Sequence, residues 1–231
     1  MAAKKTKTVR HKDLTREAYN DIRRMIFSNE LNPGQKVPYR RMADGLKMSL
    51  TPVVQALKHM EFMGLVRHEQ NKGFFIENVT PEEINEAYEL RRILEPRLLA
   101  ETIPRLDAAG EKHIEKALDE YLRACRKGSL KLKLVKDIQF HMSMAELSGQ
   151  KLSILMLRHL FDFLYLRFSQ ELLFSRPWED ASKAHSDIFS AIKERDVPKA
   201  TDLLEAHITG IHQNALEGIE DRLSDQEEII F

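Results

Sequence analysis

The chain has 231 residues, of which 42% are hydrophobic and 31% are charged, and its net charge is zero at neutral pH. This composition is typical of a globular protein of about two domains and excludes a disordered or fibrous chain. The single cysteine, Cys125, excludes an intrachain disulfide and fits a reducing compartment, so we expect a cytoplasmic protein. Residues 1–12 lack the apolar core of a secretory signal, and charges interrupt the most apolar stretch, residues 152–168, so we expect no membrane span.

The zero net charge conceals an uneven distribution along the chain. Residues 1–76 carry 15 Lys and Arg against 7 Asp and Glu, whereas residues 77–231 carry 21 against 29. A basic first part beside an acidic second part predicts a nucleic-acid partner for the first part only. Residues 1–12 are basic and show no periodicity, and we expect them to form a mobile arm near DNA phosphates.

Three helices are predicted in the basic part, over residues 14–29, 39–46 and 49–63. In the third, Ser49 or Thr51 can supply the N-cap oxygen, Pro52 falls in the first turn, and Gly64 ends the helix. Its apolar residues recur at helical spacing and leave a polar outer face. The second and third helices therefore predict a helix-turn-helix unit.

A small β-hairpin is predicted directly after these helices. Residues 65–68 and 74–76 are short extended runs, and the polar and basic residues 69–73 separate them. Three helices and a hairpin over residues 13–76 make a winged helix-turn-helix domain that binds DNA. Residues 77–80 are predicted to be a linker.

Several short stretches resemble the DNA-binding domain of GntR-family transcription regulators. They are Leu31–Gly34, Ser49–Val53, Ala56-Leu57, Gly64–Val66 and Gly73–Ile76. The family usually has arginines where this chain has Leu50 and Val54, so DNA affinity or site preference should differ from the family norm. The residues expected to contact DNA are Arg40, Arg41, Lys47, Ser49, Thr51, Lys58 and Lys72. Each cation taken singly has an alternative role as a solvated surface charge.

The second part of the chain reads as entirely helical. Thr80 and Glu83 form a capping box with Pro81 at the first helical position. Helical periodicity then covers residues 81–103, 108–126, 129–147, 150–170, 179–194 and 197–220. These segments predict an antiparallel helical bundle over residues 81–221. Residues 222–231 are a tail, which we expect to be disordered from Ser224.

Four side chains on the apolar faces of these helices are candidate metal ligands. Asp137 and His141 are four residues apart and so share one helical face, while His185 and His207 lie on the apolar faces of the last two helices. Imidazole and carboxylate groups suit a divalent transition metal such as Zn, Ni, Mn or Fe. The alternative is that the histidines are hydrogen-bonded packing residues.

The stretch Leu90–Pro96, together with these four positions, resembles the C-terminal ligand-sensing domain of the FadR subfamily. The resemblance implies that Asp137, His141, His185 and His207 bind a metal in the bundle centre and that a small carboxylate completes its coordination. Arg91 and Arg167 are then candidates to pair with the carboxylate, because a guanidinium fork matches its two oxygens. Their alternative is a salt bridge within the protein.

Taken together, the sequence predicts a mainly α, dimeric, ligand-responsive transcription regulator rather than an enzyme. Two copies would read a palindromic operator, and effector binding would shift the dimer between DNA-competent and incompetent arrangements. One alternative is a metal-dependent enzyme that uses the histidine and aspartate site to activate water. A second is a sensor whose DNA binding is weakened by Leu50 and Val54.

Overall fold

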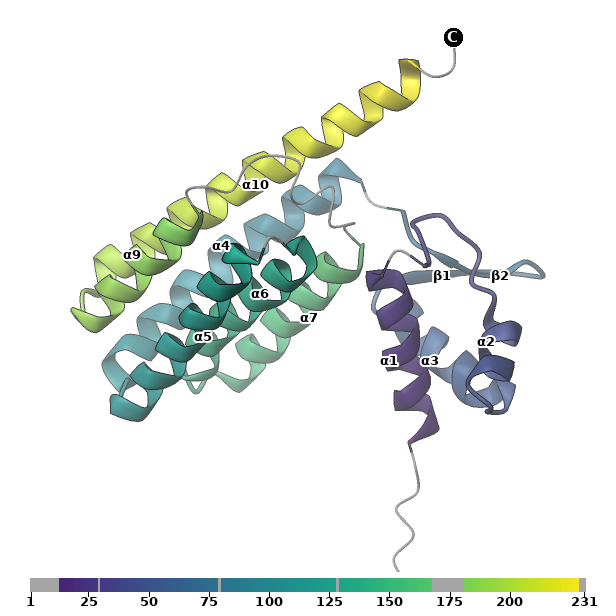
Figure 1. Ribbon diagram of the computed structural model, residues 1–231, viewed down its shortest axis with the longest axis horizontal. Helices are drawn as coiled ribbons and strands as arrows, with labels where there is room; N and C mark the ends of the chain where they lie inside the picture. The colour runs from purple at the N-terminus through teal and green to yellow at the C-terminus, as the bar shows by residue number, and fades with distance from the viewer. Residues whose placement is uncertain (1–12, 29, 79, 128, 168–180, 229–231) are drawn as a thin grey trace, which may run out of the picture. The chain divides into compact units, whose positions relative to one another are not determined.

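The computed structural model describes residues 13–228, apart from residues 29, 79, 128 and 168–180. The side chains of residues 27, 130, 131, 166, 167 and 219–228 also lie outside the description. The chain divides into two compact units, Met1–Glu77 and Asn78–Phe231 (Figure 1). No helix among the described residues is both long and apolar enough to cross a membrane.

The first unit contains the three predicted helices, α1 (Leu14–Phe27), α2 (Tyr39–Gly45) and α3 (Leu50–Phe62). Asp13 caps α1, since its carboxylate accepts a hydrogen bond from the backbone N–H of Arg16. Ser49 occupies the N-cap position of α3, but its side chain makes no capping hydrogen bond. Gly64 has a φ of 70° just beyond α3, a conformation that glycine adopts without strain and that turns the chain into the hairpin.

The predicted wing is confirmed as an antiparallel hairpin of β1 (Val66–Glu69) and β2 (Gly73–Ile76). Val66 lies opposite Ile76 and Glu69 lies opposite Gly73, so β1 is displaced by one residue from the predicted run. Gly73 has a φ of 101°, and a Cβ there would lie only 3.3 Å from the Tyr39 ring. The hairpin can therefore pack closely against the start of α2 only with glycine at this position.

The core of the first unit explains which side of α3 stays exposed. Ile22, Leu57, Met60, Leu65 and Ile76 are fully buried, and they come from α1, α3, the turn after α3 and the hairpin. Because α1 and β1 pack on one side of α3, the opposite side carries the exposed residues of that helix. This is the arrangement of a winged helix-turn-helix domain.

The second unit begins with the predicted capping box at α4 (Pro81–Thr102). The Thr80 hydroxyl accepts a hydrogen bond from Glu83 N–H at 3.2 Å, and Thr80 N–H donates to the Glu83 carboxylate at 3.2 Å. The elements that follow are η1 (Ile103–Arg105), α5 (Ala108–Arg126), α6 (Leu130–Glu146), α7 (Lys151–Arg167), α9 (Ala181–Lys193) and α10 (Val197–Glu228). The predicted ends at residues 170 and 179 lie outside the described residues.

One prediction for this unit is wrong. Helix α10 was expected to end at residue 220, but it continues to Glu228, so residues 224–228 are helical rather than disordered. Residues 197–228 contain no proline after Pro198, and glutamate and leucine in this stretch favour the helix, so the helix continues through Gly210 and Gly218.

The helices pack into a bundle in which α4 is central. Helix α4 contacts α6, α7 and α10, while α5 contacts α6 and α9 (Figure 1). One cluster of the core comprises Leu98, Met142, Ala145, Leu157 and Phe161. The mainly α fold that the sequence predicted is confirmed, and α4, α6, α9 and α10 surround the candidate metal centre.

Candidate metal centre and nucleic-acid interface

The four potential metal ligands meet inside the helical unit. Asp137 and His141 lie one turn apart on α6, His185 lies on α9 and His207 on α10. All four side chains are buried, and one ligand atom from each lies within 4.8 Å of the others. The structure therefore brings together the residues that the sequence predicted.

The distances within this cluster suit ligands of a single ion. His185 Nε2 lies 3.3 Å from His141 Nε2 and 3.2 Å from Asp137 Oδ1. His141 Nε2 lies 4.0 Å from Asp137 Oδ2. Two ligands that are each about 2.1 Å from one ion are separated by about 3–4 Å. The cluster therefore fits a divalent cation.

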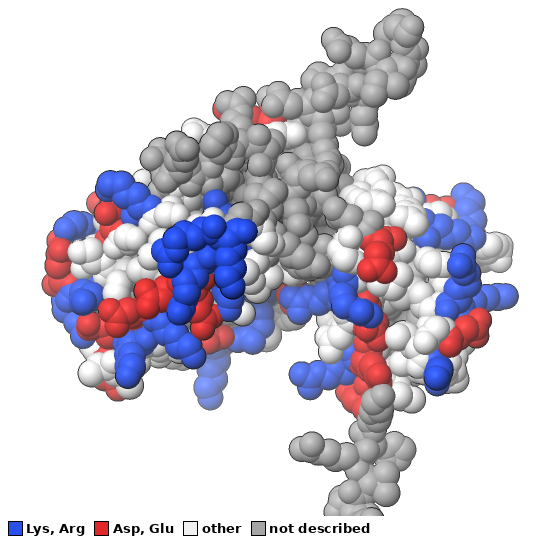
Figure 2. All heavy atoms as spheres, viewed as in Figure 1, with Lys and Arg blue, Asp and Glu red and all other residues white. Residues whose placement is uncertain are grey.

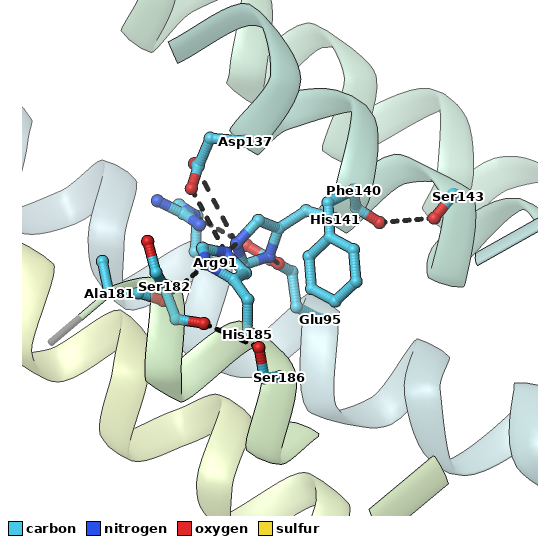
Figure 3. Close-up of polar contacts among 10 residues, drawn as sticks. All are labelled: Arg91, Glu95, Asp137, Phe140, His141, Ser143, Ala181, Ser182, His185 and Ser186. Carbon is cyan, nitrogen blue, oxygen red and sulfur yellow. Dashed lines mark hydrogen bonds and ion pairs between the residues drawn. The ribbon is translucent and has the colours of Figure 1, made fainter. Parts of the chain in front are cut away.

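The hydrogen bonds of the two central histidines determine which nitrogen carries the proton. His141 Nδ1 lies 2.5 Å from the Glu95 carboxylate, and His185 Nδ1 lies 2.8 Å from the Ala181 carbonyl oxygen (Figure 3). Both partners can only accept, so each Nδ1–H donates and each neutral ring keeps a lone pair on Nε2. The two Nε2 lone pairs face each other at 3.3 Å, an arrangement that a shared cation stabilises.

The pKa values of the clustered side chains favour the protonation states that bind a cation. Burial lowers the pKa of His185, and burial together with the neighbouring His185 and His141 lowers the pKa of His207 well below its usual value of 6.5. Burial raises the pKa of Asp137, but the surrounding imidazoles have the larger effect and hold that pKa well below its usual value. At neutral pH Asp137 is thus an ionised carboxylate, and burial favours the neutral imidazoles of His185 and His207, which are the forms that bind metal.

Glu95 on α4 is part of this centre, and sequence reasoning missed it. Its carboxylate accepts from His141 Nδ1 and, at 2.6 Å, from Arg91 Nε. Burial raises the pKa of Glu95, but Arg91 and His141 outweigh burial and leave that pKa below its usual value. A carboxylate behind a ligating histidine fixes the ring orientation and tautomer. The available signal was the four-residue spacing of Arg91 and Glu95 on one helix.

Arg91 forms the salt bridge within the protein that the sequence allowed as its alternative role. It forms the buried ion pair with Glu95, while its Nη2 has no hydrogen-bond partner among the described residues. Its guanidinium carbon lies 4.9 Å from the Phe161 ring centroid and 5.2 Å from that of Tyr88. A buried donor without a partner is costly, so it marks a place for an acceptor. The side chain of Arg167 lies outside the described residues.

His212 on α10 is also buried, although it is not one of the four potential ligands. Its ring stacks on Tyr88 at a centroid distance of 5.1 Å, and its Nδ1 lies 3.1 Å from Arg92 Nη1. His212 therefore joins α10 to α4 beside Arg91.

Acidification is expected to destabilise the metal-free protein. The pKa values of His185 and His207 are lower in the folded chain than their usual 6.5, so the unfolded chain binds more protons as the pH falls below that value. Stability is therefore fully present above pH 6.5 and is lost below it, by at most about 1.4 kcal/mol per pH unit for each histidine. The measurement is the melting temperature in chelator between pH 8 and pH 5.

Two histidine variants sharpen this test. His207→Gln removes one titrating group and should flatten the pH dependence. His113→Gln replaces an exposed histidine on α5 and should leave the dependence unchanged. A melting temperature that is constant or rises on acidification would contradict the assignment of neutral buried histidines.

The residues expected to contact DNA are all exposed and lie on α2, on α3, between these two helices and, for Lys72, in the hairpin turn. Lys and Arg side chains are visible along the edge of this unit that carries α2 and the hairpin (Figure 2). Arg40, Arg41 and Lys47 form no ion pair with any described residue. Lys58 and Lys72 are instead paired with Glu61 at 2.6 Å and with Glu69 at 2.9 Å. The first three cations therefore have the stronger claim to phosphate contacts.

The fold and the two sites define a DNA-binding regulator with a helical sensor domain. Residues 86–210 match the FCD domain family, and residues 14–76 match the bacterial regulatory proteins of the gntR family. The chain belongs to the GntR-family transcription regulators that carry an FCD domain. The expectation of a regulator rather than an enzyme is thereby confirmed, and domains of this family can bind metal.

Similarity to individual proteins and solved structures is consistent with this family membership. The chain is 24% identical over 190 residues to an uncharacterized HTH-type transcriptional regulator, YdhC of Bacillus subtilis, covering 82% of this chain and 85% of that protein. It is 26% identical over 193 residues to the Nta operon transcriptional regulator of Aminobacter aminovorans, covering 80% and 86%. The fold matches E. coli McbR/YncC with a TM-score of 0.74 at 20% identity, over 91% of this chain and 99% of that chain. A GntR regulator from Rhodococcus sp. RHA1 matches with a TM-score of 0.76 at 21% identity, over 89% and 99%.

Proposed function

We propose that the helical unit binds one divalent transition metal through Asp137, His141, His185 and His207, and that a small carboxylate effector bound there controls DNA binding. The observation that carries this proposal is the pair of Nε2 lone pairs facing each other at 3.3 Å, since both Nδ1 atoms already donate elsewhere. The donor set suits Zn, Ni, Mn or Fe. The metal, when bound, supplies a positive charge and open coordination positions.

Arg91 is proposed to bind the effector carboxylate. Its Nη2 is buried and has no described partner, while Glu95 and the rings of Tyr88 and Phe161 hold the guanidinium in place. A preorganised guanidinium needs little ordering when it binds an anion. Arg167 remains a prediction from the sequence.

The DNA contacts are proposed for α2, the start of α3 and the wing. Ser49 does not cap α3 with its side chain, and Pro52 has no N–H, so the first N–H groups of α3 and the Ser49 and Thr51 hydroxyls are available to phosphate oxygens. Arg40, Arg41 and Lys47 add exposed charge on α2 and just after it, and Lys58 and Lys72 can exchange their carboxylate partners for phosphates. Because the partner is chromosomal DNA, we propose a cytoplasmic protein.

The active form is proposed to be a homodimer on a palindromic operator. GntR regulators bind DNA operators and typically act as dimers. Helix α7 exposes Leu152, Leu155 and Met156 at helical spacing on the side opposite its buried residues, and the adjacent α4 exposes Leu90 and Ile93. Such spacing fits a helix from a second copy, and a two-fold dimer buries one patch against itself. We propose this surface of α7 and α4 as the dimer contact.

DNA binding is expected to weaken steeply with salt. Three phosphate contacts per protomer give six per dimer, and six contacts correspond to a loss of about 1,000-fold in affinity between 50 and 200 mM salt. Arg40→Ala removes two contacts per dimer and should make the slope of log affinity against log salt shallower by about two. Fluorescence anisotropy on a duplex enriched from random DNA measures both.

Arg24→Ala is the matched control for this test. Arg24 is an exposed arginine on α1 that pairs with Asp21 at 2.7 Å, so its loss should leave the salt slope unchanged. If no duplex, including DNA flanking the gene, binds better than random DNA at low salt, the proposed interface is wrong.

A further inference from the structure

The exposed face of α3 is uncharged over its first two turns. Leu50, Thr51 and Gln55 are exposed and Val54 is half-buried, whereas Lys58 is the first cation of the helix. Leu50 keeps 39% of its surface exposed although it is a large apolar residue. The buried side of the helix already contains Pro52, Val53, Ala56 and Leu57, so the first unit does not need Leu50 or Val54 for its core.

In a helix-turn-helix domain the N-terminal residues of the recognition helix approach base edges in the major groove. This step rests on the proposed placement of α3 in DNA. Arg40, Arg41 and Lys47 are exposed cations that lie instead on α2 and just after it, where they suit phosphates. The uncharged face of α3 is therefore the surface that contacts the base edges.

Aliphatic side chains have one complementary group in the major groove. Each base pair presents hydrogen-bond donors and acceptors there, and only thymine adds a C5-methyl group. Leu50 and Val54 can gain from burying that methyl but leave the guanine acceptors unsatisfied. Gln55 accepts a hydrogen bond from the Thr15 hydroxyl at 2.9 Å, so its NH₂ group is the part left to donate to a base.

We propose that Leu50 and Val54 determine operator specificity by contacting thymine methyl groups, so that each half-site carries T·A pairs beneath the first two turns of α3. Gln55 donates to an acceptor on a neighbouring base edge. At the base pairs beneath residues 50 and 54, the protein therefore selects thymine by shape and methyl contact. An arginine at either residue would select guanine instead.

The test begins with selection of bound sequences from a random 24-base-pair duplex library by the full-length protein. In the enriched duplex, each thymine is then replaced by deoxyuridine, which removes the methyl group and keeps the base pairing. Loss of one buried methyl is expected to weaken binding about fourfold, and loss of the symmetric pair about 16-fold. 5-Methylcytosine paired with guanine at the same position keeps the methyl and should bind better than unmethylated cytosine there.

Variants connect the methyl effect to named side chains. Leu50→Ala should abolish the deoxyuridine effect at one position per half-site, and Leu50→Arg should change the enriched base there from thymine to guanine. Because residue 50 is exposed, both variants should keep the wild-type circular dichroism spectrum and melting temperature. Lys72→Ala on the wing should weaken all duplexes alike and keep the full deoxyuridine effect.

The outcomes separate this inference from the function on which it rests. If no sequence is enriched over random DNA, the proposed DNA interface and the inference are both overturned. If a sequence is enriched but contains no thymine whose methyl matters, DNA binding stands and the inference is wrong. Full deoxyuridine sensitivity in both Leu50→Ala and Leu50→Arg would equally overturn it.

Discussion

Protein carrying both His185→Ala and His207→Ala is expected to contain no bound divalent metal and to melt at the temperature of chelator-treated wild-type protein. The double variant removes two of the four proposed ligands from α9 and α10. At a hundredfold excess over its Kd, a bound metal stabilises the fold by about 2.7 kcal/mol, because the unfolded chain lacks the site. In a chain of this length that is a melting-temperature difference of roughly 5–10 °C.

Metal analysis and thermal melting with and without chelator measure this effect for Zn, Ni, Mn and Fe. His113→Ala is the matched control, because His113 is an exposed histidine on α5 and should not alter metal content. Glu95→Gln provides an intermediate case, since it keeps all four ligands but weakens the support of His141, and metal affinity should fall by about 10- to 100-fold. Unchanged metal content in the double variant would refute the assignment, as would a chelator-insensitive melt of metal-loaded wild-type protein.

The variant Leu152→Glu with Met156→Glu is expected to be monomeric at micromolar concentration and to bind a palindromic duplex at least about 100-fold more weakly. Both residues are exposed on α7, at 69% and 56%, so the substitutions should leave the fold intact. A two-fold contact places the introduced charges close to their own copies in a desolvated interface. Once the protomers separate, the second half-site no longer binds at high effective concentration.

Light scattering and DNA binding on the same samples measure both consequences. Ala109→Glu with His113→Glu is a matched control, because these exposed residues on α5 have the same four-residue spacing and the charge change is the same. The control should remain dimeric and keep most of its DNA affinity. A dimeric Leu152→Glu, Met156→Glu variant would show that another surface joins the protomers.

The local structure of this protein was largely predictable from sequence because short-range chemistry determines it. The capping box at Thr80 and Glu83 and the turn at Gly64 depend on residues within a few positions of each other. The winged helix followed from these signals together with apolar periodicity. The end of α10 was missed because the expected disorder rested on composition and not on a stop signal.

The candidate metal site was predictable only in part. The four-residue spacing of Asp137 and His141 is visible in one helix, but their approach to His185 and His207 depends on the packing of three helices. Glu95 was missed because a carboxylate in a helix is usually solvated, and only the fold shows that it is buried against His141. The pairing of Lys58 and Lys72 with nearby glutamates likewise depends on side-chain conformations, which spacing alone does not determine.

Under the proposed function, the shared carboxylate of Glu95 would couple the binding of the metal to that of the effector. The same side chain pairs with Arg91, which is proposed to bind the effector, and with His141, which is proposed to bind the metal. An effector carboxylate bound to Arg91 Nη2 would share the charge of Arg91 with Glu95, so the Glu95 carboxylate would interact more strongly with His141 and make its imidazole a stronger ligand. By reciprocity, metal loading then raises effector affinity by the same factor. The metal concentration in the cell would then set the effector concentration at which the regulator responds. The regulated gene would respond strongly when metal and effector are both present and weakly when only one of them is.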